Sequence, residues 1–127
     1  MTELLEDIAD GIGDTPLVEL NKLTSDLDGT VFGKLESKNP GGSVKDRIAY
    51  SMIKAAEVDG TLEPGMTIIE PTSGNTGIGI ALMGAVLDYN VVVTLPEGTG
   101  SERQALLKSY GAEVHTTPIE KGMRGAI

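Results

Sequence analysis

Cysteine is absent from this chain of 127 residues, and histidine occurs only once, at position 115. Without cysteine the chain forms no disulfide and no thiolate metal site. A zinc site built from several histidines and a Ser-His-Asp triad are also disfavoured, because His115 stands alone. We therefore expect no metal site.

Large aromatic residues are scarce as well. Tryptophan is absent and phenylalanine occurs once, so the core must consist of aliphatic residues and methionine. The length allows a single domain with a modest core. No apolar run approaches the roughly 18 residues that cross a membrane. The N-terminal sequence "MTELLEDIAD" is acidic and unlike a signal peptide. We expect a cytoplasmic protein without a membrane partner.

Positive charge is the third scarce property. Ten Lys and Arg residues face 19 Asp and Glu residues, which gives a formal net charge of −9. Binding of nucleic acid needs a basic face, so a nucleic-acid partner is disfavoured. The excess of acid is concentrated in residues 1–36. A high-salt cytoplasm and an ordinary acidic surface both account for this composition.

The first third of the chain predicts short elements. Residues 3–9 have the pattern of a short acidic amphipathic helix, which Gly11 and Gly13 would end. The segments 15–20 and 30–36 read as strands.

A regular alternation of helices and strands follows. Polar residues precede two of the helices, so Ser43 and Ser101 are the expected N-caps. Gly111 is expected in the C′ position of the third helix. The expected elements are a helix over 44–58, a strand over 66–70, a helix over 75–87, a strand over 90–95, a helix over 101–110 and a strand over 112–117.

Three helix-then-strand units in a row predict an α/β fold. We expect a three-layer arrangement, in which a parallel sheet with right-handed crossovers carries helices on both faces. Ligands bind such sheets at the carboxyl ends of the strands, which points to the loops 71–76 and 96–101. The last ten residues, "PIEKGMRGAI", read as the opening of a fourth helix. This ending predicts that the chain is a fragment of a longer protein.

One loop has the composition of an anion site. The stretch "IIEPTSGNTGIG" (68–79) leads from a strand through a polar loop into a helix. Gly74 and Gly77 allow the backbone to approach a ligand closely. Free N–H groups at the positive end of a helix bind small anions, so we expect a pocket for a carboxylate or phosphate. An ordinary N-cap turn has a similar composition. The polar side chains of the loop are Thr72, Ser73, Asn75 and Thr76.

Two familiar nucleotide motifs fit poorly. No lysine follows these glycines, as a P-loop would require. Gly74, Gly77 and Gly79 follow the order GxxGxG, which reverses the GxGxxG order of a dinucleotide-binding loop. Glu97 lies 20 residues after Gly77, near the position of a ribose-binding acid. Dinucleotide binding therefore stays an alternative.

A lysine lies near the start of the first expected helix of this alternation. In "KNPGGSVKDR" (38–47), Lys45 falls within the first turn of the expected helix, where the dipole disfavours positive charge. The helix end and Arg47 favour the neutral amine, and Asp46 partly opposes them. A neutral amine can attack an aldehyde and form a Schiff base. An exposed lysine pointing into solvent is the alternative.

Several stretches together resemble one enzyme family. The sequence is similar to the fold-type II pyridoxal-phosphate enzymes, and in particular to cysteine synthases and cystathionine β-synthases. The resemblance covers nearly the whole chain, with the motifs in the family's order. The stretches that carry it are "GDTPLVELNKL", "NPGGSVKDRI", "EPTSGNTGIGIAL" and "SERQALLKSYGAEVHTTP".

The resemblance implies roles for residues. Lys45 matches the lysine that binds pyridoxal phosphate covalently and that removes and returns the substrate's α-proton. Asn75 matches the residue that hydrogen-bonds the cofactor's phenolic oxygen. The residues that match the family's site for the substrate α-carboxylate are Thr72, Ser73, Gly74, Asn75 and Thr76.

The implied reaction is a β-replacement. O-acetyl-L-serine would lose acetate and take up sulfide, which gives L-cysteine. The enzymatic alternative is a cystathionine β-synthase or a serine/threonine dehydratase. The alternative outside enzymes is an inactive truncated paralogue that acts as a binding module. The family usually forms homodimers, so the resemblance implies a homodimer for the full-length protein.

The chain also lacks parts of the family pattern. The glycine-rich phosphate cup and the hydroxyl residue at the pyridine nitrogen lie further along the chain in the family. The "GTG" at 98–100 sits in the wrong loop for that cup. By resemblance, residues 1–36 belong to the family's larger cofactor domain. Residues 37–127 belong to a small α/β substrate-binding domain that is truncated here.

Overall fold

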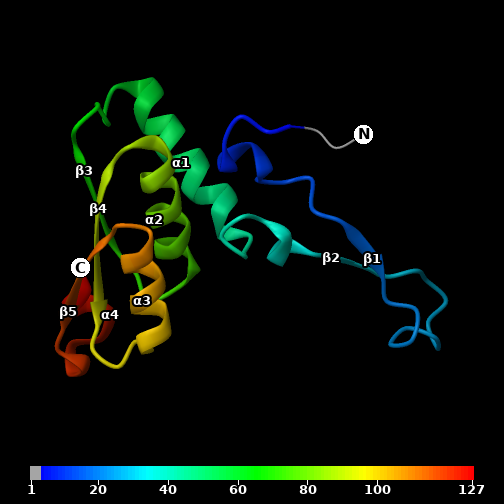
Figure 1. Ribbon diagram of the computed structural model, residues 1–127. Helices are drawn as coiled ribbons and strands as arrows, with labels where there is room; N and C mark the ends of the chain where they lie inside the picture. The colour runs from blue at the N-terminus through cyan, green and yellow to red at the C-terminus, as the bar shows by residue number, and fades with distance from the viewer. Residues whose placement is uncertain (1–3) are drawn as a thin grey trace.

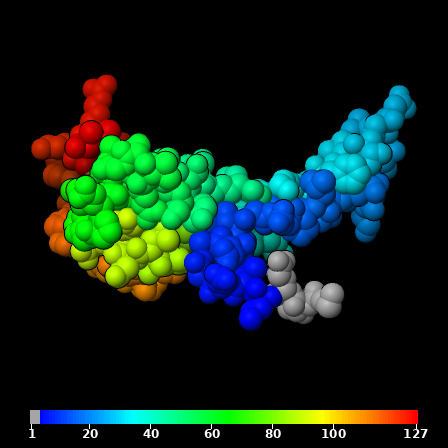
Figure 2. Space-filling model, turned by 90° about the horizontal axis from the view of Figure 1, so that it is seen from above, coloured from blue at the N-terminus to red at the C-terminus, as the bar shows by residue number. Residues whose placement is uncertain are grey.

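The computed structural model describes residues 4–127, which form a rounded body and a projecting arm (Figures 1 and 2). The body is built on a three-stranded sheet with the order β3-β4-β5. Both strand pairs are parallel, as the sequence predicts. The strands are β3 (Thr67–Pro71), β4 (Asn90–Pro96) and β5 (Glu113–Thr117).

Within residues 4–127, four α-helices accompany this sheet. The apolar helix α2 packs against β3 and β4, and α1 packs on α2 (Figure 1). Near the far end of α2, Gly84 lets Val91 of β4 come close, because a Cβ there would lie 2.3 Å from a Val91 methyl. The helices are α1 (Lys45–Asp59), α2 (Asn75–Leu87), α3 (Ser101–Ser109) and α4 (Gly122–Ala126).

Helices lie on both faces of the sheet, as predicted, but they cover them unequally. Val91 faces α2, and Thr94, three residues further along β4, therefore faces the opposite side. There the Thr94 hydroxyl donates to the Ala126 carbonyl of α4 at 2.7 Å. On this second face Ile69 of β3 is 65% exposed.

The core lies between α2 and β4. Because α2 is apolar nearly all round, it buries residues on several sides, and every other residue of β4 is buried against it. Full burial of each large aliphatic side chain contributes about 1.5–3 kcal/mol. The largest fully buried apolar side chains are Met83, Val93, Leu95 and Leu107.

The arm projects from the body (Figure 2) and contains two short strands (Figure 1). β1 (Leu17–Glu19) and β2 (Phe32–Lys34) pair antiparallel. Apolar side chains on this arm are exposed, including Leu17 at 63% and Phe32 at 54%. The assignment of residues 1–36 to a separate, larger domain stays a prediction.

In the part of the chain that the structure describes, neither β3 nor β5 has a second neighbour, so both are edge strands of the sheet. Within residues 4–127, β3 pairs only with β4. Its outer backbone groups therefore face away from the rest of the sheet.

Several predicted boundaries need correction. The predicted helix over 3–9 begins outside the described residues. From residue 4 onward it is wrong, because the chain forms only a 3-10 helix over Ile8–Gly11 with Asp7 as its cap. Ser101 is the first residue of α3 and Gly100 is its cap. Gly111 has the positive φ expected of a C′ residue.

Among the residues that the structure describes, no helix has both the length and the apolar character needed to span a membrane.

Candidate active site

The loop before α1 is held by the first turn of that helix. The Lys45 N–H donates to the Ser43 hydroxyl at 3.0 Å. Ser43 therefore accepts the first helical amide as predicted, although the cap residue is Val44, one position later. The Gly41 N–H donates to the Asp46 carboxylate at 2.6 Å. These bonds place Lys45 as the first residue of α1, half-buried.

Asp46 is an unusual neighbour for this lysine, because it is fully buried. Its Oδ1 has no hydrogen-bond partner in the part of the chain that the structure describes. Burial raises the pKa of the Asp46 carboxyl. A Cβ at Gly41 would lie 2.6 Å from Oδ1, so this glycine is required for the close approach of loop and carboxylate.

Arg47, which the sequence places two residues after Lys45, forms an ion pair with Glu36. Its guanidinium binds both oxygens of Glu36, at 2.8 and 3.0 Å, so its charge is largely neutralised. Hydrogen bonds from Arg47 and Thr15 lower the pKa of Glu36 to about 2. This cluster joins the base of the arm to α1.

The start of α1 lies against α2. A Cβ at Gly79 would lie 3.1 Å from the Lys45 carbonyl oxygen and 3.0 Å from the Ala49 Cβ. Asn75 lies one helical turn before Gly79. The structure thus brings the backbone of Lys45 within about one turn of the α2 start.

The polar loop (residues 72–76) joins β3 to α2 and is anchored at its beginning. The Thr72 N–H donates to the Thr94 carbonyl of β4 at 2.9 Å. The buried Thr72 hydroxyl accepts the Gly74 N–H at 3.2 Å. Gly77 permits this position, because a Cβ there would lie 2.1 Å from the Thr72 methyl.

The start of α2 is open to an anion. Within residues 4–127 no side chain caps its first amides, and no acidic residue lies in its first turn. The cap residue is Gly74, and Ser73 and Asn75 are exposed. Free amides and an uncompensated helix dipole favour a carboxylate or phosphate at this point.

One contact to the polar loop comes from a residue that the sequence did not single out. Nη1 of Arg103, in the first turn of α3, donates to the Ser73 carbonyl at 2.8 Å. The two residues are 30 positions apart, so no local motif reveals the contact.

The glycines of the dinucleotide alternative have other roles. Gly77 accommodates Thr72, and Gly79 accommodates the backbone of α1. Both are required for close packing between elements. They therefore give no independent support for a dinucleotide.

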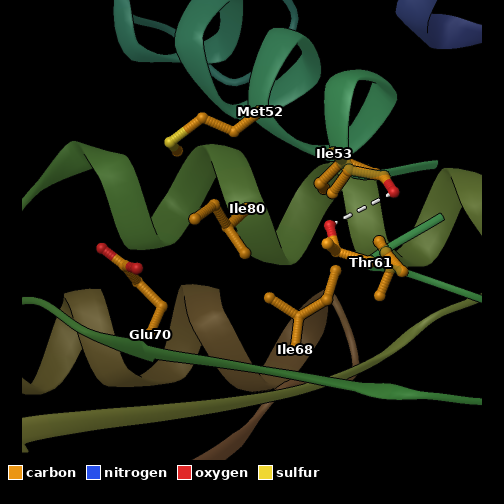
Figure 3. A pocket seen from close by; sticks show the side chains of 8 residues that line it. Met52, Ile53, Thr61, Ile68, Glu70 and Ile80 are labelled. Carbon is orange, nitrogen blue, oxygen red and sulfur yellow. Dashed lines mark hydrogen bonds between the residues drawn. The ribbon is translucent and has the colours of Figure 1, made fainter. Parts of the chain in front are cut away.

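A separate pocket lies between α1 and β3. It has a volume of about 280 Å³, and none of the predicted site residues lines it. Figure 3 shows Ile68, Ile80 and Met52 around it, with Glu70 as its one charged group. Burial raises the pKa of Glu70. The Thr61 hydroxyl at its rim donates to the Ala56 carbonyl at 3.4 Å.

Comparison with known proteins gives consistent matches. Residues 8–127 match the family described as pyridoxal-phosphate dependent enzyme. The chain is 52% identical to a cysteine synthase from Staphylococcus aureus and 50% identical to a cystathionine beta-synthase from Dictyostelium discoideum, over 97% and 92% of its length. The crystal structure of a cysteine synthase from Entamoeba histolytica, 44% identical, matches over 98% of the chain with a TM-score of 0.93.

These relatives are much longer proteins. The chain spans 40% of the S. aureus protein and 24% of the D. discoideum protein. It covers 38% of the E. histolytica chain.

Proposed function

The chain belongs to the family of pyridoxal-phosphate-dependent enzymes, and from this premise we propose that it is all or part of a cysteine synthase. The proposed reaction makes L-cysteine from O-acetyl-L-serine and sulfide. Similarity to a cysteine synthase at 52% identity supports this choice.

The residues present fit the cofactor's reactive group. Pyridoxal phosphate carries an aldehyde, which a primary amine captures. Lys45 is half-buried at the start of α1, and Asp46, the acid next to it in sequence, binds the Gly41 amide. The Asp46 carboxylate is thus engaged by the loop before α1. Lys45 is the residue that we propose to hold the cofactor, with Asn75 as a hydrogen-bond partner.

The polar loop is the proposed site for the α-carboxylate of the amino acid. The open amides at the start of α2 would bind the carboxylate oxygens. The proposed donors from side chains are Thr72, Ser73, Asn75 and Thr76, and Gly74 lets the backbone come close. Binding at this point would fix the orientation of the amino acid relative to Lys45.

Proton transfer is the second role of Lys45. When bound, pyridoxal phosphate withdraws electrons from the substrate's α-carbon. The Nζ atom of Lys45 would take the α-proton and later return it. The observation that carries this proposal is the uncapped start of α2, packed one turn away from the backbone of Lys45.

Borohydride trapping tests the proposal. The protein is incubated with pyridoxal phosphate, reduced and digested, and the labelled peptide is identified by mass spectrometry. We expect the label on Lys45 and none in Lys45→Ala. Lys38→Ala is the matched control, because Lys38 is exposed in the preceding segment and its loss should leave labelling unchanged. A label on a different lysine would refute the assignment.

A cystathionine β-synthase is the second candidate, because the D. discoideum relative is 50% identical. A serine/threonine dehydratase is the other enzymatic alternative. Product analysis with O-acetylserine plus sulfide, against serine plus homocysteine, separates the two syntheses. Formation of a keto acid from serine would indicate a dehydratase.

The isolated chain is expected to bind the cofactor weakly and to show little activity. It would hold the lysine and the polar loop without the phosphate cup, which the resemblance places further along the sequence. A chain that stays colourless at every cofactor concentration would favour the binding module. We further propose that the full-length protein is cytoplasmic and forms a homodimer. Analytical ultracentrifugation would test the homodimer.

A further inference from the structure

We propose that Arg103 is a positioning residue, which holds the polar loop in the shape that receives the substrate's carboxylate. The inference rests on the proposed function of the polar loop and names a residue outside it. It starts from a hydrogen bond that joins α3 to this loop, from Arg103 Nη1 to the Ser73 carbonyl at 2.8 Å.

This bond holds one end of the peptide group between Ser73 and Gly74. The carbonyl of Ser73 and the N–H of Gly74 belong to the same planar group and point in opposite directions. The N–H of Gly74 donates to the Thr72 hydroxyl at 3.2 Å, and the carbonyl accepts from Arg103. Both ends of the peptide plane are therefore held, and the plane cannot rotate without breaking a hydrogen bond.

The orientation of this plane matters for the amides that follow it. Gly74 is the cap residue of α2, and the next amides are those of Asn75 and Thr76. With no side-chain cap in the described residues, these amides depend on the backbone of the polar loop for their direction. Fixing that backbone before the ligand arrives lowers the ordering cost of binding.

The helix that carries Arg103 is well anchored. Arg103 is half-buried in the first turn of α3, a helix that packs on α2 and β5. The rigid body of the sheet thus supports the polar loop through one long side chain. A lysine at this position would keep the charge and most of the reach, but it would lack the planar fork of donors.

Amide chemical shifts measure the effect directly. The isotope-labelled protein is titrated with L-serine, and the amides of Asn75 and Thr76 are followed. L-serinamide, which lacks the carboxylate, is the matched ligand control. We expect saturable shifts with serine and none with serinamide. In Arg103→Met the dissociation constant for serine should rise about five- to tenfold, as for the net loss of one exposed hydrogen bond.

Two variants separate position from charge. Arg103→Lys should recover part of the affinity, and Lys108→Met, which removes an exposed charge at the far end of α3, should bind serine like the wild type. Amide hydrogen exchange at Gly74 should be faster in Arg103→Met, because its peptide plane is released. A merely structural loss would instead lower the melting temperature and speed exchange throughout α3.

The outcomes are distinct. If the Asn75 and Thr76 amide shifts of the wild type do not change with serine, the proposed carboxylate site is refuted. The role of Arg103 is then refuted with it. If the wild type responds and Arg103→Met binds serine equally well, only the role of Arg103 is refuted. Equal weakening in Lys108→Met, or unchanged exchange at Gly74, would also overturn it.

Discussion

Replacement of Gly77 by alanine tests the packing beneath the polar loop. A Cβ at Gly77 would lie 2.1 Å from the Thr72 methyl, which is far inside van der Waals contact. Thr72 is 8% exposed and its hydroxyl binds the Gly74 amide, so its side chain cannot turn away without losing that bond. The new methyl must therefore shift either the start of α2 or the polar loop.

Two opposing terms set the size of the effect. Overpacking of a buried site costs about 1–3 kcal/mol, and the severity of this contact places it near the upper value. Alanine is a better helix former than glycine by about 1 kcal/mol. We expect Gly77→Ala to lower the free energy of unfolding by about 2 kcal/mol, as the difference of these two terms.

A double-mutant cycle identifies the cause. Thr72→Ser removes the clashing methyl but keeps the hydroxyl, since the other Thr72 atoms lie 3.4 Å or more from the added Cβ. In urea denaturation, Gly77→Ala should therefore cost less in the Thr72→Ser background, with a coupling of about 1–2 kcal/mol. Additive costs would refute the reasoning, because they would mean that the added methyl strains some other contact.

Two further predictions concern charge. The pKa of Glu36 is lowered from 4.5 to about 2 in the folded state, so its contribution to stability is fully present above pH 4.5 and is lost as the pH falls towards 2. Urea midpoints at pH 6, 4 and 3 should fall less steeply in Glu36→Gln than in the wild type, and parallel curves would contradict this. If the net charge of −9 reflects a high-salt cytoplasm, molar salt should raise the melting temperature by screening repulsion between acidic groups. Equal melting temperatures at low and molar salt would count against that origin.

The sequence predicted the body of the fold well because its patterns there are strong. The helix over 75–87 is confirmed at both ends, and the strand over 90–95 extends by one residue. A continuous apolar helix and a β-branched run leave few alternatives. From residue 4 onward the predicted acidic helix over 3–9 failed because its apolar side chains Leu4, Leu5 and Ile8 stay exposed, so no packing offsets the nucleation cost of so short a helix.

The candidate site was only partly predictable. Local motifs located Lys45 and the polar loop, and the structure adds that α1 and α2 bring their starts together at Gly79. The contacts of Arg103 with Ser73 and of Arg47 with Glu36 join residues 30 and 11 positions apart. Such contacts depend on how elements pack, which composition and spacing do not encode. The pocket beside Glu70 was missed for the same reason, because separate elements build its walls.

The unpaired outer edge of β3 affects how the chain associates with other chains. A row of backbone donors and acceptors with nothing beside it is a template that any extended peptide can match, whatever its sequence. A strand added there would place alternate side chains beside Ile68 and Glu70, in the neighbourhood of the apolar pocket. Backbone pairing and filling of the pocket would then reinforce each other, so concentrated solutions of the chain should associate through this edge. The variant Ile69→Pro would remove one backbone donor from this exposed edge and should therefore reduce aggregation of such solutions.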